Sequence, residues 1–286
     1  MNDSLCYIII VNYNSSSNTI NCINSILEST YSNFQIILVD NYSTDDSLNS
    51  LKTFYSNIDK ITIIKSDKNG GYGYGVNIGL KHSILKKDCR YIWVLNNDTI
   101  IFNNTLEEFV SAEINSKNLK IWGSKVLNKD FTIQSLGCRI NKYFMTTKHN
   151  YNGFKDICYD KSKYKIDYIH GCSMFFNKDV VNRVGLFDEN YFLFYEDVDY
   201  SMQSKRNNIS LDICNKSKII HKENSTIKKM NYEFYSTSNR LKIAKKYFSN
   251  KLLFVYIGIF FELIKNIFLL RLNRNYLILK EIIYEF

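Results

Sequence analysis

The stretch that decides the fold reads Tyr-Ile-Trp-Val-Leu-Asn-Asn-Asp-Thr, residues 91–99. Five apolar residues, Tyr91–Leu95, lead directly into Asn96, Asn97 and Asp98. An apolar run this short is typical of a strand buried on both faces of a parallel sheet, and such strands present functional groups at their carboxyl ends. We therefore expect Asp98 at the rim of a crevice, where a carboxylate beside amide oxygens suits a hard divalent cation. An ordinary turn explains the same three polar residues without a ligand.

Strands and helices alternate in the first half of the chain. Apolar runs at residues 6–11, 34–39 and 61–64 predict three more strands, and helical spacing of apolar residues follows the first two. Ser43 and Asp46 resemble a capping box. The glycine-rich segment 69–75 predicts a loop, followed by a helix over about 76–86. This alternation indicates an α/β fold with a doubly wound parallel sheet.

Polar side chains follow three of these predicted strands. Asn12 and Asn14 come after the first strand, Asp40 ends the second and Asp98 follows the fourth. Nucleotides bind at such sheet edges. Asp40 can accept hydrogen bonds from a base or ribose, or can instead cap a helix or turn. Glycines allow close approach of a phosphate, but their spacing here matches neither the dinucleotide fingerprint nor the P-loop.

The second half contains one compact block of acids and aromatics, residues 185–200. A helix over 196–206 would place Glu196 and Asp199 on one face. Asp197 would lie in the first turn among apolar neighbours, which raise its affinity for a proton and suit a general base. Acids also favour a helix N-terminus through the backbone dipole, which is the alternative.

The segments around this block are less regular. The predictions are a hairpin within 133–144, a strand over 167–177 and a short helix over 179–184. His149 is expected at the surface. His221 ends a further strand-like run and is either a metal or phosphate ligand or an exposed histidine.

The chain appears helical from residue 231 onward. Its apolar run at 252–261 is interrupted by Glu262 and Lys265, which is too early for a membrane-spanning helix of about 20 residues. Basic residues beside an apolar face fit a helix lying on anionic lipid. Packing on the domain itself or on a second subunit is the alternative.

Composition limits the classes of function. The 286 residues are 45% hydrophobic and carry a net charge of +9, which indicates an anionic partner such as nucleotide phosphates or acidic lipid. The seven cysteines include no Cys-x-x-Cys pair, so neither a zinc site nor a disulfide framework is predicted and a reducing cytosol is expected. The first apolar run is too short for a signal peptide. No nucleic-acid partner is expected, because the basic residues are spread out and match no known module.

Five blocks of residues together resemble a family 2 glycosyltransferase of the GT-A fold, in the rhamnosyltransferase-like group that builds bacterial surface polysaccharides. The resemblance covers residues from about 7 to about 240. The blocks occur in the family's order at residues 10–14, 39–45, 69–79, 95–99 and 185–199.

The resemblance implies a Rossmann-like GT-A domain with a mixed, mainly parallel sheet. This domain would cover residues 1–225, with a nucleotide-binding half over 1–116 and an acceptor-binding half over 117–225. A helical C-terminal region would follow over 226–286. One departure lies at 238–240, Ser-Asn-Arg, where relatives tend to have Arg-Asn.

The resemblance also implies roles for individual residues. Asp197 matches the catalytic base, with Glu196 in reserve. Asp98 matches the surviving acid of the family's Asp-x-Asp metal signature, whose first position is Asn96 here. His221 matches a histidine that helps to hold the metal or diphosphate. The implied nucleotide-sugar pocket comprises Asn12, Asn14, Asp40, Asn41, Asn69, Gly71, Asn77, Asn96 and Asn97, and the implied acceptor contacts are Tyr191, Phe194 and Tyr195.

The activity implied by the resemblance is inverting transfer of a sugar from a nucleotide-diphospho-sugar, with Mg²⁺ or Mn²⁺, to a hydroxyl of a lipid-linked glycan. The setting would be O-antigen or capsule synthesis, on the cytoplasmic face of the inner membrane. Rhamnose from a dTDP donor is the first expectation, and a UDP-hexose or UDP-N-acetylhexosamine is the alternative. Two alternatives belong to other classes of function. One is a non-catalytic scaffold on the membrane surface, and the other is an oxidoreductase that binds a dinucleotide.

Overall fold

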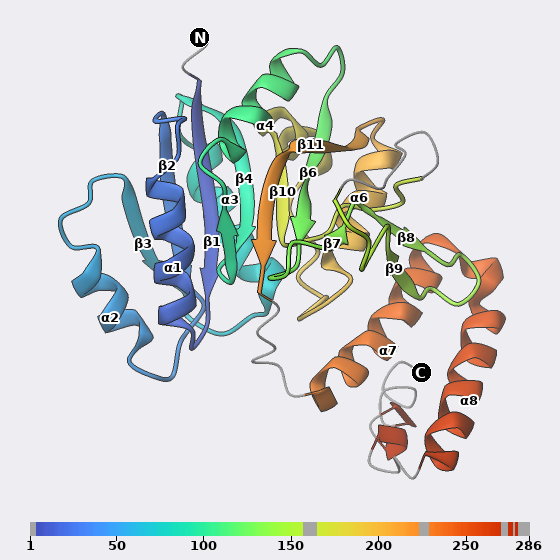
Figure 1. The fold of residues 1–286 in the computed structure, drawn as a ribbon. Coiled ribbons are helices and arrows are strands. Elements are labelled where there is room, and N and C mark those ends of the chain that lie inside the picture. Colours follow the sequence, from blue (N-terminus) through green and yellow to red (C-terminus); the bar gives the residue numbers. More distant parts are fainter. Residues whose placement is uncertain (1–3, 157–164, 223–228, 270–273, 277, 280–286) are drawn as a thin grey trace.

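A nine-stranded mixed sheet forms the centre of the protein (Figure 1). The computed structural model describes residues 4–156, 165–222, 229–269, 274–276 and 278–279. The strands run across the sheet in the order β3 (Ile61–Lys65), β2 (Phe34–Asp40), β1 (Leu5–Asn12), β4 (Cys89–Asn96), β10 (Ser173–Asn177), β6 (Lys120–Leu127), β11 (Ser210–His221) and β5 (Thr99–Ile101), and β7 (Ile133–Ser135) pairs with β6.

The sheet is parallel on one side and mixed on the other. Strands β3, β2, β1 and β4 run parallel, and the apolar runs of β1, β2 and β4 are buried on both faces, as a parallel sheet requires. Strand β10 is antiparallel to both β4 and β6. Because β10 reverses direction, its first residues lie at the same edge of the sheet as the last residues of β4. The predicted α/β class with a mainly parallel sheet is confirmed.

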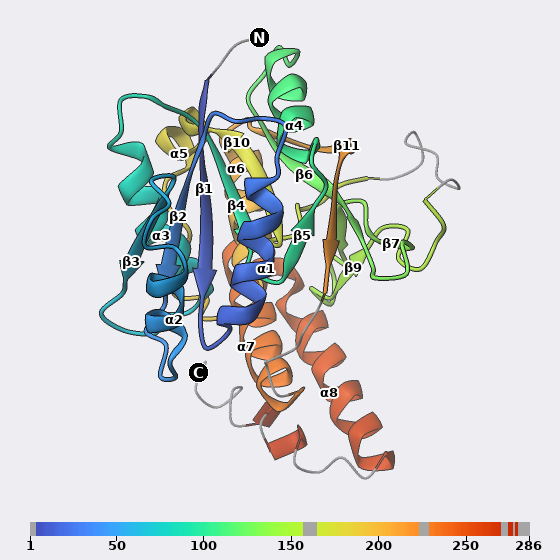
Figure 2. The same cartoon turned by 60° about the vertical axis from the view of Figure 1, so that its left-hand side comes forward.

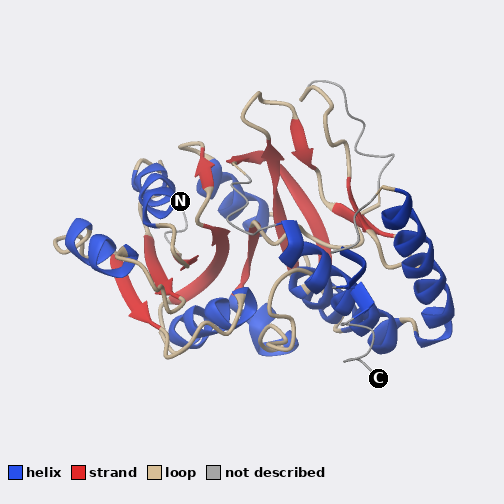
Figure 3. Ribbon diagram, turned by 90° about the horizontal axis from the view of Figure 1, so that it is seen from below, coloured by secondary structure: helices blue, strands red, loops and turns tan. Residues whose placement is uncertain are grey.

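Helices cover both faces of the sheet, which gives three layers (Figure 3). On one face, alternate strand residues pack against apolar residues of α1 (Ser16–Leu27), α2 (Ser47–Phe54) and α4 (Thr105–Ile114). The intervening strand residues pack on the other face, against α3 (Tyr72–Ile84), α5 (Lys178–Val184) and α6 (Glu196–Arg206). Two separate apolar layers therefore pack on opposite faces of one sheet.

A third apolar cluster joins the C-terminal helices to α6 and the β8–β9 ribbon. Helix α7 (Lys229–Tyr247) leads through a 3₁₀ turn, η2 (Ser249–Lys251), into α8 (Leu252–Phe268). Residues of α7 and α8 pack against α6 and a two-stranded ribbon of β8 (Cys138–Ile140) and β9 (Thr147–His149). Figures 1 and 2 both place α7 and α8 beyond the end of the sheet to which β1 points. The predicted boundary between residues 225 and 226 lies outside the described residues, so this division stays a prediction.

Buried ionic contacts tie α7 to α6. Asp199 is fully buried, and one of its oxygens lies 2.8 Å from Nζ of Lys246. The hydroxyl of Tyr247 donates to the same oxygen at 2.8 Å, and Gln203 Nε2 donates to the other. Because a buried carboxylate is costly without partners, these contacts make the docking of α7 specific. Asp199 therefore serves helix docking.

Two local predictions were wrong. Helix α3 begins at Tyr72, so Gly73 and Gly75 are helical and do not belong to a loop. Helix α2 starts after Asp46, and the Ser43 hydroxyl donates to Asp40 at 2.6 Å, so no capping box forms. Asn12, at the end of β1, donates to the same Ser43 hydroxyl at 3.1 Å, a contact that local sequence spacing does not reveal.

Two predictions in the middle of the chain also differ from the structure. Residues 133–144 form no hairpin, because β7 pairs with β6 and β8 pairs with β9. The predicted strand over 167–177 is regular only from Ser173, where its pairing with Leu95 begins. The preceding residues form the loop that lines the site described below.

Helix α3 lies so close to β1 that its glycines leave no room for a side chain. A Cβ at Gly79 would lie 2.4 Å from Cγ2 of Ile9, and one at Gly75 would lie 2.7 Å from Cγ1 of Val11. Valine and isoleucine are stiff and sit in the central strand, so neither can move aside easily. Gly75, which the sequence placed in a phosphate-like loop, therefore serves close packing of helix on sheet, as Gly79 does.

We expect Gly79→Ala to lower the free energy of unfolding by about 1–3 kcal/mol, because overpacking against Ile9 outweighs the gain in helix propensity of about 1 kcal/mol. Lys81→Ala on the exposed face of α3 is the matched control and should change stability by less than about 0.5 kcal/mol. Urea unfolding followed by circular dichroism measures both. Equal midpoints for the two variants would contradict the close packing of α3 on β1.

Candidate active site

The site lies where the ends of four strands meet. Strand β4 ends at Asn96, and the Asn96 N–H donates to the carbonyl of Cys172, immediately before β10, at 3.0 Å. The end of β11 pairs with the start of β5, with His221 opposite Thr99. The Lys222 N–H donates to the Asp98 carbonyl at 3.0 Å. Strand register therefore brings Asp98, Cys172 and His221 to one edge from three distant parts of the chain.

Asp40 is the centre of a buried polar network at the ends of β1 and β2. Its carboxylate accepts hydrogen bonds from Asn12 Nδ2 at 2.9 Å, from the Ser43 hydroxyl at 2.6 Å and from the Ser43 N–H at 3.0 Å. Thr19 donates to Asn12 Oδ1 at 2.8 Å, and Asn97 Nδ2 donates to Thr19 at 2.9 Å. Asn12 and Asp40 are both fully buried, so in this arrangement their polar atoms bind one another and their neighbours in the protein.

Asn14 and Asn41 continue this network. Asn14 exchanges hydrogen bonds with Thr44 at 2.8 and 3.0 Å and has a left-handed backbone with φ of 49°. Asn41 Nδ2 donates to Asn69 Oδ1 at 3.1 Å and to the Gly71 carbonyl at 3.0 Å. Within the described residues, the buried Asn41 Oδ1 has no hydrogen-bond partner. That oxygen is available for a donor on a ligand.

Gly71 requires glycine both for its backbone conformation and for space. Its φ is 93°, and a Cβ there would lie 2.1 Å from the carbonyl oxygen of Phe192. That same carbonyl accepts the Tyr72 N–H at 2.9 Å. The start of α3 is thereby fastened to the acidic–aromatic block.

Asn77 does not face the pocket edge. Its side chain donates to the Phe187 carbonyl at 2.9 Å and to Glu189 at 2.8 Å, and it accepts the Phe187 N–H at 2.9 Å. Asn77 is buried, and these three bonds fix the loop after α5 against α3. The side chain of Asn77 therefore binds other parts of the protein in this structure.

Asp98 and His221 form the candidate centre for a hard metal ion. Oδ1 of Asp98 lies 3.1 Å from Nε2 of His221, and Nδ1 of His221 lies 2.8 Å from Oε1 of Gln134. Oδ1 of Asp98 is buried, yet nothing in the described part of the chain makes a hydrogen bond of good geometry to it. An orphaned carboxylate oxygen beside an imidazole fits the ligand chemistry of Mg²⁺ or Mn²⁺.

Glu196 and Asp197 open helix α6 beside this centre. Asp197 is partly exposed, and its two oxygens accept the N–H groups of Gly171 at 2.9 Å and Val198 at 2.8 Å. Burial raises the pKa of Asp197 above its usual range, although these two hydrogen bonds oppose the shift. Burial and the Asp197 charge raise the pKa of Glu196. Both shifts favour binding of a proton, as a general base requires.

Tyr72 connects the two carboxylate groups. Its hydroxyl donates to the Gly171 carbonyl at 3.3 Å. Burial raises the pKa of Tyr72 well above its usual value, and the charges of Glu196, Cys172, Asp197 and Asp98 act in the same direction. The Tyr72 hydroxyl therefore lies within electrostatic range of both Asp98 and Asp197. Sequence reasoning missed Tyr72, because it sits among glycines that looked like a loop.

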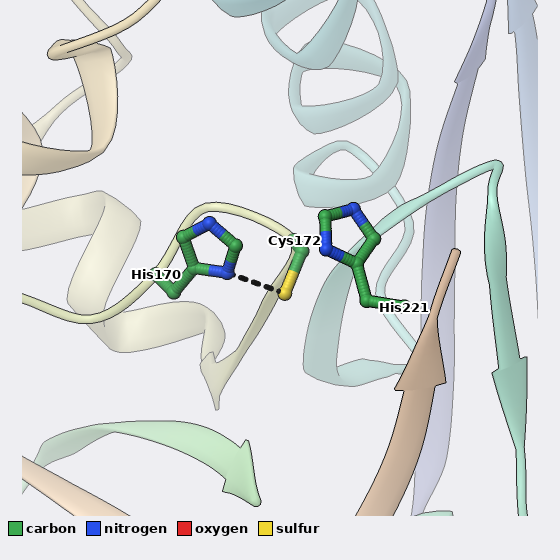
Figure 4. A group of neighbouring side chains, drawn as sticks. All are labelled: His170, Cys172 and His221. Carbon is green, nitrogen blue, oxygen red and sulfur yellow. Dashed lines mark hydrogen bonds between the residues drawn. The ribbon is translucent and has the colours of Figure 1, made fainter. Parts of the chain in front are cut away.

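His170 and Cys172 were also missed. One ligand atom from each of His170, Cys172 and His221 lies within 4.8 Å of the others (Figure 4). Nδ1 of His170 lies 2.8 Å from Sγ of Cys172. Burial lowers the pKa of His170 well below its usual value, and the neighbouring His149 and His221 add to the shift. The pair His-x-Cys within the predicted strand over 167–177 was a usable signal, since short spacings of this kind recur in metal sites.

The predicted acceptor residues lie mostly inside the protein. Tyr191 is 2% exposed and Tyr195 is 6% exposed, and the Tyr195 hydroxyl donates to the Met145 carbonyl at 2.8 Å. Neither ring can stack on an acceptor sugar in this arrangement. Phe194 is intermediate in exposure and, like Tyr195, has a left-handed backbone. Two adjacent non-glycine residues with positive φ are costly and are typical of functional sites.

Residues 238–240 support this strained turn. Asn239 Nδ2 donates to the carbonyls of Leu193 at 2.9 Å and Phe194 at 2.8 Å. Arg240 is buried and pairs with Glu262 of α8 at 2.8 Å. The Ser-Asn-Arg departure therefore places the amide under the acidic–aromatic block and directs the arginine into the C-terminal helices.

Comparisons with known proteins agree with this geometry. Residues 7–185 match the profile described as glycosyl transferase family 2. The chain belongs to that family.

Two curated relatives illustrate the breadth of the family. The chain is 26% identical over 255 residues to the low-salt glycan biosynthesis hexosyltransferase Agl10 of Haloferax volcanii, covering 86% of this chain and 77% of the relative. It is 25% identical over 224 residues to the dTDP-rhamnosyl transferase RfbF of Shigella flexneri, covering 77% and 70%. The predicted family is confirmed.

Solved structures share the fold. A mannosyltransferase from Pyrobaculum calidifontis, solved with GDP-Man and Mn²⁺, superposes with a TM-score of 0.60 at 12% identity, over 84% of this chain. GalNAc-T7, solved with UDP, GalNAc and Mn²⁺, superposes with a TM-score of 0.66 at 14% identity, over 85% of this chain. The chain spans 63% and 48% of these two proteins. The predicted GT-A fold is confirmed.

We expect Asn77→Ala to lower the free energy of unfolding by about 2–3 kcal/mol, because it leaves the buried Phe187 N–H without an acceptor. Asn115→Ala, on an exposed helix end, should change stability by less than about 0.5 kcal/mol. Thermal unfolding without any ligand measures both. A purely nucleotide-binding role for Asn77 predicts the opposite: unchanged stability of the free protein and weaker donor binding.

Proposed function

We propose that this glycosyltransferase moves a sugar from a nucleotide-diphospho-sugar to a hydroxyl of a lipid-linked glycan, with inversion at the anomeric carbon. One observation carries the proposal. The segment His170–Cys172 touches both proposed reaction centres, because the Gly171 N–H binds Asp197 while His170 and Cys172 lie against His221, the partner of Asp98. A diphosphate bound near Asp98 and a base at Asp197 would then lie on opposite sides of one sugar.

The donor would lie over the ends of β1, β2 and β4. The unpaired Asn41 Oδ1 would accept a hydrogen bond from the nucleotide, beside the buried pair of Asn12 and Asp40. A divalent ion held by Asp98 and His221, Mg²⁺ or Mn²⁺, would neutralise charge on the leaving diphosphate. Tyr72 would form part of the wall between the donor and the acceptor. Asn69 and Gly71 would shape the loop that closes over the nucleotide.

Asp197 would accept the proton of the acceptor hydroxyl. Its two backbone hydrogen bonds hold the carboxylate in one orientation, and its partial exposure leaves it accessible. Glu196 is more buried, and its Oε2 has no hydrogen-bond partner within the described residues, so it is the reserve base. Direct displacement by a hydroxyl activated on the opposite face inverts the anomeric carbon, by the stereochemical logic of inverting hydrolases.

For the donor we propose dTDP-rhamnose first, in O-antigen or capsule synthesis, because one curated relative is a dTDP-rhamnosyl transferase. A UDP-hexose or UDP-N-acetylhexosamine is the alternative, because another relative is a hexosyltransferase. A thermal-shift screen of these donors with Mn²⁺ distinguishes them, since a ligand that binds only the folded protein raises its melting temperature.

We propose that the enzyme works at the cytoplasmic face of the inner membrane and docks through α8. Among the helices of the described residues, none combines the length and apolarity needed to cross a bilayer. Helix α8 nevertheless exposes one continuous apolar face. Its residues recur at three- and four-residue spacing and are Leu253, Phe254, Ile257, Phe260, Phe261, Ile267 and Phe268.

Charge beside the α8 apolar face selects anionic lipid over a neutral surface. Lys251 precedes the helix and lies 3.9 Å from the centre of the exposed Tyr143 ring, which itself packs on Phe254. Lys265 adds a second exposed base. An apolar stripe flanked by lysines is the pattern of a helix lying in the membrane interface. The acceptor glycan, if carried on lipid, would then be presented to the adjacent site.

We expect Asp197→Asn to lower kcat by about 10²–10⁴-fold while leaving donor affinity within a few-fold of the parent, because it removes a base and not a donor ligand. Asp212→Asn, on the surface of β11, is the control and should retain normal turnover. Transfer to a soluble acceptor analogue gives kcat, and titration calorimetry gives donor affinity.

The pH profile separates the base from a merely structural carboxylate. Because the pKa of Asp197 is raised, kcat should fall with decreasing pH well above ~4, the usual pKa of aspartate. This acidic limb should move to lower pH or vanish in the residual activity of Asp197→Asn. Normal turnover in that variant, or an unchanged acidic limb, would remove Asp197 as the base.

We expect the double variant Phe260→Ser, Phe261→Ser to bind vesicles containing phosphatidylglycerol at least about tenfold more weakly than the parent, since each buried phenylalanine contributes more than about 1 kcal/mol. Phe54→Ser, Phe131→Ser removes two equally exposed aromatics from other surfaces and should bind normally. Vesicle co-sedimentation measures both. Equal loss in the two variants, or equal binding of the parent to purely neutral vesicles, contradicts docking through α8.

A further inference from the structure

Three soft or borderline ligands meet beside the proposed donor site. His170 and Cys172 come from the loop before β10, and His221 ends β11 (Figure 4). Their ligand atoms lie within 4.8 Å of one another. We propose that His170, Cys172 and His221 form a site for a borderline-soft divalent cation, Zn²⁺, distinct in ligand type from a Mg²⁺ or Mn²⁺ centre.

The chemistry of the three ligands decides the metal. Mg²⁺ and Mn²⁺ prefer carboxylate, carbonyl and water oxygens, whereas thiolate and imidazole together select Zn²⁺. Three protein ligands of this kind leave one position of a tetrahedron. Oδ1 of Asp98 lies 3.1 Å from His221 Nε2, but the Asp98 carboxylate does not lie within 4.8 Å of all three ligand atoms, so a water molecule would take the fourth position.

The distances are compatible with a tetrahedral ion after small movements of the side chains. Zn–N and Zn–S bonds of about 2.0–2.3 Å place neighbouring ligand atoms roughly 3.3–3.8 Å apart. Nδ1 of His170 lies 2.8 Å from Sγ of Cys172, so this pair would move apart by about 0.5–1 Å. The other separations are at most 4.8 Å and would shorten by about 1.5 Å or less. Binding would release the Cys172 thiol proton to solvent, since the thiolate is the ligand.

The surroundings orient the ligands as outer contacts do in metal sites. His221 Nδ1 lies 2.8 Å from Gln134 Oε1, and His221 Nε2 lies 3.1 Å from Asp98 Oδ1. Whichever ring nitrogen binds the ion, the other therefore has an acceptor beside it, which is the usual arrangement of a metal-binding histidine. The Cys172 carbonyl accepts the Asn96 N–H, which anchors the loop to β4. The site is built on strand ends and not on a loose loop.

Occupancy by Zn²⁺ has a consequence for the enzyme. The site shares His221, which lies 3.1 Å from Asp98, with the proposed Mg²⁺ or Mn²⁺ centre. Zn²⁺ should therefore inhibit transfer by taking His221 away from the hard ion. This consequence rests on the proposed function, whereas the binding itself does not.

The test uses Co²⁺ as a spectroscopic replacement for Zn²⁺ in the full-length protein without donor or acceptor. A thiolate bound to Co²⁺ gives a near-ultraviolet charge-transfer band. We expect one Co²⁺ per chain with this band in the parent, and its stoichiometric loss on adding Zn²⁺. Cys172→Ser should lose the band and bind Zn²⁺ at least about tenfold more weakly, since even outer contacts of a metal site contribute about 10–100-fold.

Matched controls keep the result interpretable. Cys89→Ser replaces another buried cysteine, on β4, and His82→Asn replaces a histidine on α3; both should retain the band and the Zn²⁺ affinity. His170→Asn should weaken Zn²⁺ binding as Cys172→Ser does. Absence of the band in the folded parent, or its persistence in Cys172→Ser, overturns the site. Neither result bears on glycosyl transfer, which the donor and acceptor assays test separately.

Discussion

The site depends on one constraint of sheet topology: β10 runs antiparallel to β4. A parallel strand at this position would bring its carboxyl end to the edge where β4 ends. The reversal instead brings the start of β10 there, and with it the loop His170–Cys172. The Gly171 N–H then reaches Asp197 at 2.9 Å, while its neighbours in the chain reach His221. Each functional group is thus positioned by backbone pairing, which is far stiffer than contacts between side chains.

The buried polar groups around Asp40 hold one arrangement because hydrogen bonds join them to one another. Asp40 accepts three hydrogen bonds, and its neighbours Asn12 and Thr19 continue the chain of bonds to Asn97. In a low-dielectric interior an unpaired carboxylate is costly, so this network has one arrangement. Among the described residues, buried oxygens of Asn41, Asp98 and Glu196 have no hydrogen-bond partner, and the same holds for buried atoms of Asn215, Arg240 and Asn275 elsewhere in the chain. The three oxygens of Asn41, Asp98 and Glu196 can accept hydrogen bonds from a ligand or bind a cation.

The C-terminal helices are connected to the site and are not a separate appendage. Asp199 anchors α7 through Lys246 and Tyr247, only two residues after Asp197 on the same helix. Asn239 of α7 supports the strained turn that precedes α6. A surface contact made by α8 is therefore connected to the acidic–aromatic block through only a few packed residues. The same packing leaves the opposite face of α8 apolar and exposed, which is where a bilayer surface would bind.

The amino-acid sequence by itself determined the class of fold and most of the elements that matter. Period-two and continuous apolar runs located β1, β2, β3 and β4, and the acids of the block at 185–200 predicted α6 from Glu196 to Arg206, because these signals are local and periodic. Only the tertiary structure decided which side chains share the site. Asn77 and Tyr191 turned out to be internal, and Tyr72, His170 and Cys172 turned out to line the site, because burial and proximity follow from strand register and helix packing. Those contacts join residues as much as a hundred positions apart, and no local pattern in the sequence encodes them.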